Sequence, residues 1–299
     1  MYFYFMSEEK GRMDFGRIRA WMEHYSVTRV VLLFLRKLGL IHFVHIMLSN
    51  KKKKQLKGKE NDFSKFVDLH KEELQQVFDY LEDDFSKETL RAVIDYRKSY
   101  EIGLLKGVTI QPQYFLKELL PPSNHEVFID GGAYIGDSSR EFLLRYQTGE
   151  YYKIFLWEPD ENNSVVIKKT LGEKCNYEII PYALWNGRER LNFIGDGTGT
   201  SMVTKQEGNV VNADSIDNIH GNETVTFIKM DIEGAEIEAL KGAERVIKTQ
   251  KPKLAISIYH NPSHLYEIPI MIKSMVPEYK LYIRHHSDME SETVLYARI

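Results

Sequence analysis

Cysteine is nearly absent from this sequence, and so is any long apolar run without charges. Cys175 is the single cysteine among 299 residues, which excludes an intramolecular disulfide and suits a reducing compartment. The most membrane-like run, Val30–Leu48, contains Arg36 and Lys37, and each cation near the middle of a spanning helix costs about 2.5–3.5 kcal/mol. We therefore expect neither a membrane-spanning helix nor a secretory signal, and we expect a cytoplasmic protein.

The formal net charge is also small, but it is unevenly distributed. It is −3 overall, yet the stretch from His24 to Lys59 holds nine Lys or Arg and no acidic residue, which leaves −12 for the remainder. A basic arm on an acidic body argues against nucleic acid as a partner. One of two interpretations is that residues 28–59 touch the inner face of a membrane, where each basic residue contributes about 1 kcal/mol. The alternative is a helix packed on the body or on a second subunit of a homo-oligomer.

Three segments follow from changes of pattern along the chain. Residues 1–60 form a basic, apolar arm that ends in a Lys-rich break. Residues 61–120 are expected to be a helical lead-in, because apolar side chains recur at helical spacing from Phe63 to Leu81 and Ser86 is a suitable N-cap for a second helix. Residues 121–299 alternate between strand-like and helix-like stretches and form the expected catalytic domain.

This alternation predicts a mostly parallel α/β sheet with right-handed crossovers. The last two strands are joined only by Ser287–Ser291, which is too short for a parallel crossover and predicts an antiparallel hairpin at the sheet edge. That layout is typical of the Rossmann-like class I methyltransferases. The expected strands are Val127–Asp130, Ile154–Glu158, Tyr177–Ala183, Thr226–Asp231, Leu254–Tyr259, Tyr279–His285 and Thr293–Arg298; the expected helices are Ser138–Tyr146, Asn162–Leu171, Ser215–Ile219, Ala235–Lys248 and Ser263–Met275. Arg190–Gly195 is an extra strand or one arm of a hairpin.

A small-residue turn follows the first expected strand, in the segment IDGGAYIGDSS. Gly131 and Gly136 fit two glycines of the dinucleotide fingerprint, but Ala133 replaces the glycine that lets pyrophosphate approach. An acidic residue before the turn also disfavours a diphosphate and suits a ligand with an ammonium group and a sulfonium. The expected cofactor-binding residues of this turn are Asp130, Gly131, Gly132, Tyr134, Gly136, Asp137 and Ser138, with Asp130 either polarising the turn or contacting the amino acid part of the ligand.

Acidic residues end two further strands. Glu158, followed by Pro159, is placed to accept both hydroxyls of a ribose, and Ala183 with its neighbours is placed to line an adenine. Asp231 and Glu233 lie at the tip of a later strand, and Glu236 is expected to be an ordinary acid at a helix start. Three acidic strand tips predict a site for a polyhydroxylated or cationic ligand.

Histidines follow the next strands. His260 is our expected general base for a substrate hydroxyl, with Asp231 or Glu233 orienting it or serving as the alternate base, so these three residues are the expected catalytic group. Tyr259 and His285 are expected to contact the acceptor. A Mg²⁺ ion held by Asp231, Glu233 and His260 is the alternative to metal-free transfer, which we favour.

Together the segments IDGGAYIGDSS, WEPDENN, SIDNI, FIKMDIEGAEIEALKGAERVI, PKLAISIYHNPSHLYEIPIMI and YIRHHS resemble the FkbM family of S-adenosylmethionine-dependent methyltransferases. The resemblance runs from about Leu81 to the end of the chain, and Ile135 departs from the acidic or small residue that is frequent in the family. It implies a Rossmann-like fold and methyl transfer to a hydroxyl of a sugar or natural product. It assigns cofactor binding to Asp130, Gly132, Gly136, Asp137 and Glu158.

The function expected from the sequence is therefore O-methylation by S-adenosylmethionine, with a sugar hydroxyl of a glycan, a glycolipid or a sugar-bearing natural product as acceptor, as in polysaccharide biosynthesis. Alignment of the methyl donor with the acceptor contributes up to about 7–11 kcal/mol, and a base contributes about 10²–10⁴-fold. Two alternatives remain at this point. One is a nicotinamide-dependent oxidoreductase acting on a sugar nucleotide, and the other is a non-catalytic, membrane-associated subunit that keeps only the fold.

Overall fold

A computed structural model describes residues 46, 50–52, 62–146, 151–173, 175–195, 201–204 and 209–299. Most of the expected basic arm, including most of residues 28–59, therefore lies outside the described residues. Within the described part, no helix is both long and apolar enough to cross a membrane.

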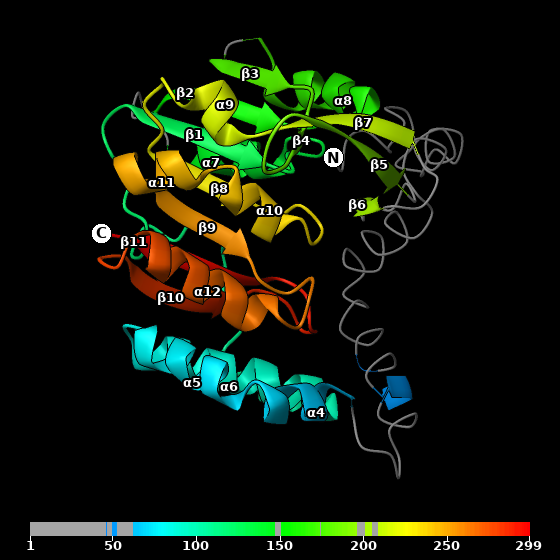
Figure 1. Cartoon of the computed structure of the whole chain (residues 1–299), viewed down its shortest axis with the longest axis vertical. Coiled ribbons are helices and arrows are strands. Elements are labelled where there is room, and N and C mark those ends of the chain that lie inside the picture. Colours follow the sequence, from blue (N-terminus) through cyan, green and yellow to red (C-terminus); the bar gives the residue numbers. More distant parts are fainter. Residues whose placement is uncertain are drawn as a thin grey trace, which may run out of the picture.

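A seven-stranded sheet forms the centre of the molecule (Figure 1). Its order is β10-β11-β9-β8-β1-β2-β3, and every neighbouring pair is parallel except those that involve β11, which is antiparallel to both β9 and β10. The expected hairpin is thus confirmed, with its second strand placed one position inside the edge. The strands are β1 (Glu126–Gly131), β2 (Tyr151–Trp157), β3 (Tyr177–Ile180), β8 (Phe227–Met230), β9 (Lys253–Ser257), β10 (Lys280–His285) and β11 (Thr293–Arg298).

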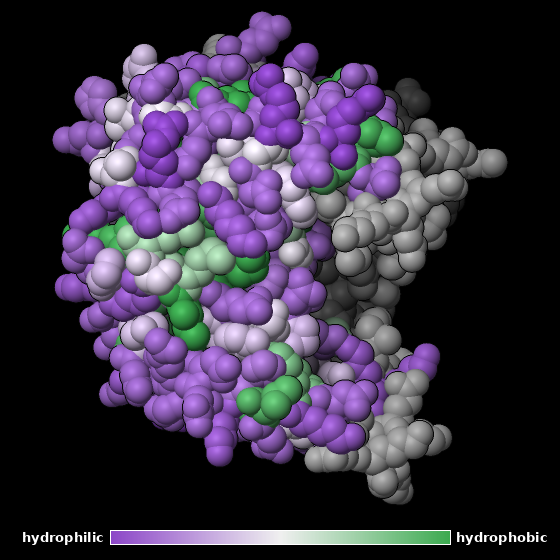
Figure 2. Space-filling view, in the orientation of Figure 1, coloured by the Kyte–Doolittle hydropathy of each residue, from purple (hydrophilic) through white to green (hydrophobic). Residues whose placement is uncertain are grey.

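Helices cover both faces of this sheet (Figure 1). Side chains alternate across a strand, so Phe128 packs with Phe142 of α7, whereas Val127 and Ile129 belong to the opposite core, with Leu240 of α10. The first face carries α7 (Asp137–Arg145) and α8 (Glu161–Leu171); the second carries α9 (Ile216–His220), α10 (Glu236–Lys241), α11 (Glu244–Gln250) and α12 (His264–Met275). The surface seen in Figure 2 is mainly hydrophilic and its hydrophobic areas are small, because most large apolar side chains lie in these two layers.

The helical lead-in packs beside β10 and α12 (Figure 1). It comprises α4 (Asp62–Leu69), α5 (Lys71–Tyr80), α6 (Asp84–Ser99) and the 3₁₀ turn η2 (Ile102–Leu104). The N-cap of α6 is Asp83, whose side chain accepts from the Ser86 amide, and not Ser86 as the sequence predicts. The Ser86 hydroxyl instead accepts from the amide of Ile283 and the guanidinium of Arg284 in β10. These contacts fix the lead-in on an edge strand that would otherwise expose unpaired backbone.

A second, four-stranded sheet was not expected as a unit. It has the order β4-β7-β5-β6 and comprises β4 (Ala183–Leu184), β5 (Glu189–Gly195), β6 (Ser201–Thr204) and β7 (Asn209–Asp214). The single strand predicted over Tyr177–Ala183 divides because Pro181 lacks a donor for the ladder and β4 turns away to pair with β7. The single helix predicted over Ala235–Lys248 divides at Gly242, where a Cβ would lie 2.1 Å from the Trp185 carbonyl oxygen.

Candidate active site at the carboxyl ends of the strands

The order of strands along the chain reverses between β1 and β8, since β2 follows β1 on one side and β8 to β11 lie on the other. In open α/β sheets, ligands bind outside the carboxyl ends of the strands at such a switch point. The glycine turn after β1 and the acidic tip of β2 lie on one side of it, and the tips of β8 and β9 lie on the other.

The glycine turn after β1 packs directly on the tip of β8. A Cβ on Gly132 would lie 2.0 Å from the Asp231 carbonyl oxygen, and a Cβ on Gly131 would lie 2.9 Å from the Lys229 carbonyl oxygen. Gly132 also has a φ of 71°, in the left-handed region that favours glycine. These two glycines are therefore required for the close packing of the turn on β8, whether or not a ligand also approaches them.

Three amides of this turn already donate to acceptors within the protein. Ala133 N–H donates to the Trp157 carbonyl at 3.1 Å and Gly136 N–H to the Ala133 carbonyl at 2.7 Å. Tyr134 N–H donates to Oε2 of Glu158 at 2.8 Å. A phosphate site at a glycine-rich turn relies on free amides, so this turn is poorly suited to a pyrophosphate.

Asp130 anchors the turn rather than facing the crevice. Its side chain is fully buried, with Oδ1 3.0 Å from Nζ of Lys229 and Oδ2 accepting from the hydroxyls of Ser138 and Ser139 at 2.6 and 2.7 Å. The same Nζ donates to the Gly131 and Gly132 carbonyls at 3.1 and 3.0 Å. Burial lowers the pKa of Lys229, but the charges of Asp130 and other acids outweigh it and leave that pKa raised. Of the two roles expected for Asp130, its contacts support polarising the turn.

Lys229 is the part of this anchor that sequence reasoning missed. It lies in the buried strand β8 within the motif FIKM, and a lysine in a buried strand is itself a signal, because a buried lysine needs a partner.

Glu158 lies directly after β2 and is 6% exposed. Its carboxylate accepts from the amides of Tyr134 and Asp160 and from the side-chain amide of Asn163. Burial raises the pKa of Glu158 to about 7, in spite of these donors. A buried carboxyl group beside a glycine turn suits the two hydroxyls of a ribose, so the residues here fit the nucleoside of S-adenosylmethionine.

The remaining residues that the sequence predicts on the cofactor side do not share one environment. Asp137 is exposed at the start of α7, and Pro159 is half-buried beside Glu158. The Ala183 side chain is buried with Leu191 and Ala213 of the second sheet, so it does not line the turn. Its neighbour Leu184 does, since a Cβ on Gly131 would lie 2.5 Å from Leu184 Cδ1.

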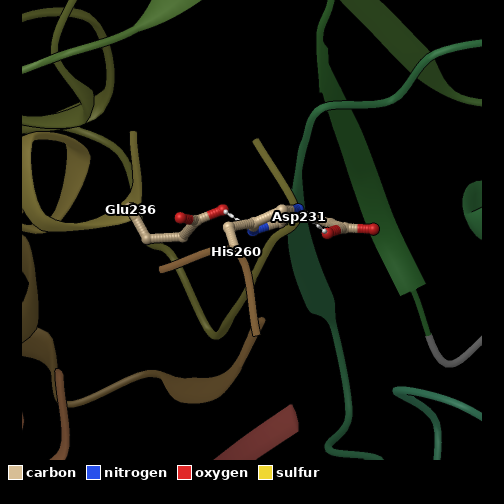
Figure 3. Close-up of side chains that lie close together, drawn as sticks. All are labelled: Asp231, Glu236 and His260. Carbon is tan, nitrogen blue, oxygen red and sulfur yellow. Dashed lines mark ion pairs between the residues drawn. The ribbon is translucent and has the colours of Figure 1, made fainter. Parts of the chain in front are cut away.

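On the other side of the switch point, the imidazole of His260 lies between carboxylates (Figure 3). Nδ1 is 3.0 Å from Oε1 of Glu236, and Nε2 is 3.3 Å from Oε2 of Glu233 and 3.5 Å from Oδ1 of Asp231. Burial lowers the pKa of His260, but the carboxylates outweigh it and raise that pKa to about 10. At neutral pH these carboxylates favour the imidazole with both protons, which argues against the general-base role that the sequence predicts.

Glu236 is more than an acid at a helix start. It is fully buried and accepts from the Ile232 amide at 2.9 Å, while Oε2 lies 3.3 Å from Nδ1 of His264. Burial raises its pKa, but the two histidines outweigh burial and lower that pKa to about 2. Glu236 thus connects the loop after β8 to the loop after β9. The sequence signal for Glu236 was its place in the first turn of α10, because that turn directs the side chain back toward the strand tips.

Asp231 is surrounded by donors. Its Oδ2 accepts from the Tyr114 hydroxyl at 2.8 Å and its Oδ1 from the Tyr259 hydroxyl at 3.0 Å. Tyr114 belongs to an irregular segment without a motif, so no sequence pattern indicated that it reaches the site. Glu292, immediately before β11, is a further acidic residue of this region, and its carboxylate accepts from the side-chain amide of Gln113.

Metal binding requires ligand atoms that converge on one point. Among the described residues, Asp231, Glu236 and His260 offer ligand atoms within 4.8 Å of one another, with Glu236 where the sequence predicted Glu233. However, Glu236 addresses Nδ1 and Asp231 faces Nε2 (Figure 3). A metal here would bind a His260 nitrogen that has lost its proton, in competition with these ion pairs. In the structure as described, these three side chains form an ion-pair chain.

His285 does not reach this crevice. It is fully buried in β10, where Nδ1 lies 2.9 Å from Oγ1 of Thr293 on β11, and burial lowers its pKa to about 4. The expected contact between His285 and an acceptor is therefore wrong, because the residue is fully buried and its Nδ1 faces Thr293 of the neighbouring strand.

The helical lead-in also reaches the site. Arg97 of α6 donates to the carbonyls of Tyr259 and Glu290 at 2.9 and 3.1 Å. It therefore joins the loop after β9 to the loop between β10 and β11. Lys52, one of the few described residues of the basic arm, pairs with the Glu290 carboxylate and lies 5.0 Å from the Tyr100 ring centroid.

Comparison with known proteins agrees with this geometry. Residues 130–290, more than half of the chain, match the methyltransferase FkbM domain, whereas no curated protein matches the sequence. A crystal structure of methyltransferase FkbM from Methylobacillus flagellatus KT is 29% identical with a TM-score of 0.68, and the match covers 79% of this chain and 60% of that one. Fibrillarin from Aeropyrum pernix with natively bound S-adenosyl-L-methionine is 11% identical (TM-score 0.39; 66% of this chain, 73% of that one), and an Aquifex aeolicus SAM-dependent methyltransferase is 16% identical (TM-score 0.38; 61% and 86%). The chain belongs to the FkbM family of S-adenosylmethionine-dependent methyltransferases.

Proposed function

We propose that this protein transfers a methyl group from S-adenosylmethionine to a hydroxyl of a sugar, carried by a glycan, a glycolipid or a sugar-bearing natural product. The observation that carries the proposal is the division of the site at the switch point. A buried carboxylate suited to ribose, Glu158, lies on the β2 side, and a cluster of carboxylates, tyrosine hydroxyls and one imidazolium lies on the β8–β9 side.

The residues of the two sides have separate tasks. Glu158 and the glycine turn hold the nucleoside, and the Lys229–Asp130 pair keeps the turn in place. When bound, S-adenosylmethionine supplies an electrophilic methyl carbon. Asp231 and Glu233 accept hydrogen bonds from acceptor hydroxyls, and the His260 cation balances part of their charge. A polar surface rich in acceptors suits a polyhydroxylated molecule.

The occupied amides of the glycine turn disfavour the oxidoreductase alternative, because a dinucleotide needs them for its pyrophosphate. A non-catalytic subunit would have no reason to retain buried charges such as Glu158 and Glu236, whose burial costs free energy unless they are paired.

Calorimetric titration with S-adenosylmethionine tests the cofactor part of this proposal. Hydrogen bonds to a charged group contribute about 1.5–3 kcal/mol, so Glu158→Gln should weaken binding by about 10- to 150-fold. Glu161→Gln, a change of an exposed acid three residues further along the chain, is the matched control and should leave the affinity unchanged. Tighter binding of NADH than of S-adenosylmethionine would contradict the proposal.

Methyl transfer itself is tested with methyl-labelled S-adenosylmethionine and a panel of methyl glycosides of hexoses and deoxyhexoses. A product heavier by one methylene group, with the label on a sugar oxygen, is the expected result. Label on nitrogen or carbon would show a different acceptor chemistry.

We also propose that the basic arm brings the enzyme to an anionic membrane surface, where lipid-linked sugars are assembled. The support is the charge pattern of residues 28–59. Deletion of residues 1–59 should abolish co-sedimentation with vesicles that contain phosphatidylserine, while phosphatidylcholine vesicles serve as the control. Unchanged co-sedimentation of the truncated chain would refute this part.

A further inference from the structure

Glu292 is held on the acceptor side of the site by two separate connections to Asp231. In the first, consecutive residues bind the two carboxylates, since Gln113 donates to Glu292 and the Tyr114 hydroxyl donates to Asp231. In the second, the Ile258 amide donates to the Thr293 carbonyl at 2.9 Å, which places the residue after Glu292 beside the residue before Tyr259. Both connections bring Glu292 to the crevice above β8 and β9.

The backbone conformation of Glu292 also indicates that this residue is held in a fixed position. Its φ is 66°, in the left-handed region that a non-glycine residue seldom adopts, and its carbonyl accepts from the His286 amide at 3.0 Å. Its side chain is neither fully buried nor fully exposed. Such strain costs about 1–3 kcal/mol and is often found at functional sites.

The other acidic groups of the acceptor side are engaged with cations or with several donors. Asp231 accepts from two tyrosine hydroxyls and faces the His260 ring. Glu233 faces Nε2 of the same ring at 3.3 Å, and Glu236 is fully buried against Nδ1. Glu292 differs from these three carboxylates because each of them faces the His260 ring, whereas Glu292 accepts from the uncharged Gln113 amide.

The groups around Glu292 shift its pKa in opposite directions, and the net shift is upward. Burial and the negative charges of Asp231 and Glu233 raise its pKa, while Gln113 and the His260 cation lower it, and the result is about 7. A general base acts best when its pKa lies close to the working pH.

We propose that Glu292 is the general base for the acceptor hydroxyl, an inference that rests on the proposed methyl transfer. The O–H bond of the acceptor breaks and its proton passes to a carboxylate oxygen of Glu292. The electron pair left on oxygen forms the new bond to the methyl carbon, and the pair of the broken carbon–sulfur bond leaves with sulfur. Glu292 then returns the proton to water. His260 remains protonated throughout and keeps the neighbouring carboxylates in position.

The first test does not depend on activity. In the full chain labelled with ¹³C at glutamate side-chain carboxyls, NMR titration should show two resonances with midpoints near pH 7, those of Glu158 and Glu292. Glu292→Gln should remove one and Glu158→Gln the other, whereas Glu278→Gln, a change at an exposed acid, should remove neither. A Glu292→Gln protein that retains both resonances would overturn the proposal.

The second test uses methyl transfer to the methyl glycosides. Glu292→Gln should lower kcat by about 10²–10⁴-fold and remove the fall in rate on the acid side of pH 7, while the Kd for S-adenosylmethionine stays within twofold. Glu292→Asp should recover part of the rate. An unchanged rate and pH profile would refute the role of Glu292 alone. If the unaltered protein binds no S-adenosylmethionine, or methylates no sugar hydroxyl, the proposed function fails, and the inference fails with it.

Discussion

Replacing Lys229 by methionine should show that the glycine turn depends on a buried ion pair. The Lys229 and Asp130 side chains are 3% and 0% exposed, and the ammonium also donates to two carbonyls of the turn. Removing one partner of a buried pair costs about 3–5 kcal/mol, because the other charge stays buried without compensation. Since a domain has only about 5–15 kcal/mol of stability, we expect a large loss.

Urea denaturation followed by circular dichroism measures this loss directly. Lys248→Met is the matched control, because Lys248 pairs with Glu244 on the exposed face of α11, and such a pair contributes only about 0.3–0.5 kcal/mol. Adding Asp130→Asn to Lys229→Met should recover much of the stability, since no unpaired charge then remains. A loss below about 1 kcal/mol for Lys229→Met would refute the reasoning, as would a double variant no more stable than Lys229→Met.

Further predictions concern the packing, the ion-pair chain and the lead-in. Gly132→Ala should prevent stable folding or cofactor binding, because its Cβ would lie 2.0 Å from a carbonyl oxygen, whereas Gly103→Ala, with nothing within 4 Å, should be silent in thermal melts and calorimetry. The folded pKa of Glu236, about 2, lies below its ordinary value, so its contribution to stability is present above about pH 4.5 and is lost as pH falls toward 2; Glu236→Gln should remove this limb from a plot of Tm against pH. The folded pKa of His260, about 10, lies above its ordinary value, so its contribution is present below about pH 6.5 and lost as pH rises through 10; His260→Gln should flatten the alkaline limb. Arg97→Gln should accelerate hydrogen exchange in both loops that its guanidinium joins, without change in the Kd for S-adenosylmethionine.

The sequence predicted the main sheet well because its signals are local. Short apolar stretches separated by helical patterns determine the parallel strands, and the five-residue connection before the last strand determines the hairpin. The second sheet could not be predicted in the same way. The two-residue strand β4 carries too little periodicity to be recognised, and it exists only because β7 pairs with it.

The candidate site was predicted in outline for the same reason. Acidic residues at strand tips are visible in the sequence, and the sheet brings Asp130, Glu158 and Asp231 to one edge. The direction in which each side chain points, however, is not visible in the sequence. Asp130 turns inward to Lys229, and His285 is covered by its own hairpin.

The protonation state of His260 shows why chemistry at such a site cannot be read from residue types alone. A histidine after a strand suggests a base because its ordinary pKa is near 6.5. That expectation holds only if few charges surround the ring, and here three carboxylates from the β8–α10 segment do so. Two of these carboxylates, Asp231 and Glu233, also disfavour a further negative charge nearby and so raise the pKa of Glu292. The same cluster therefore removes the base role from the histidine and assigns it to a carboxylate that no motif marks.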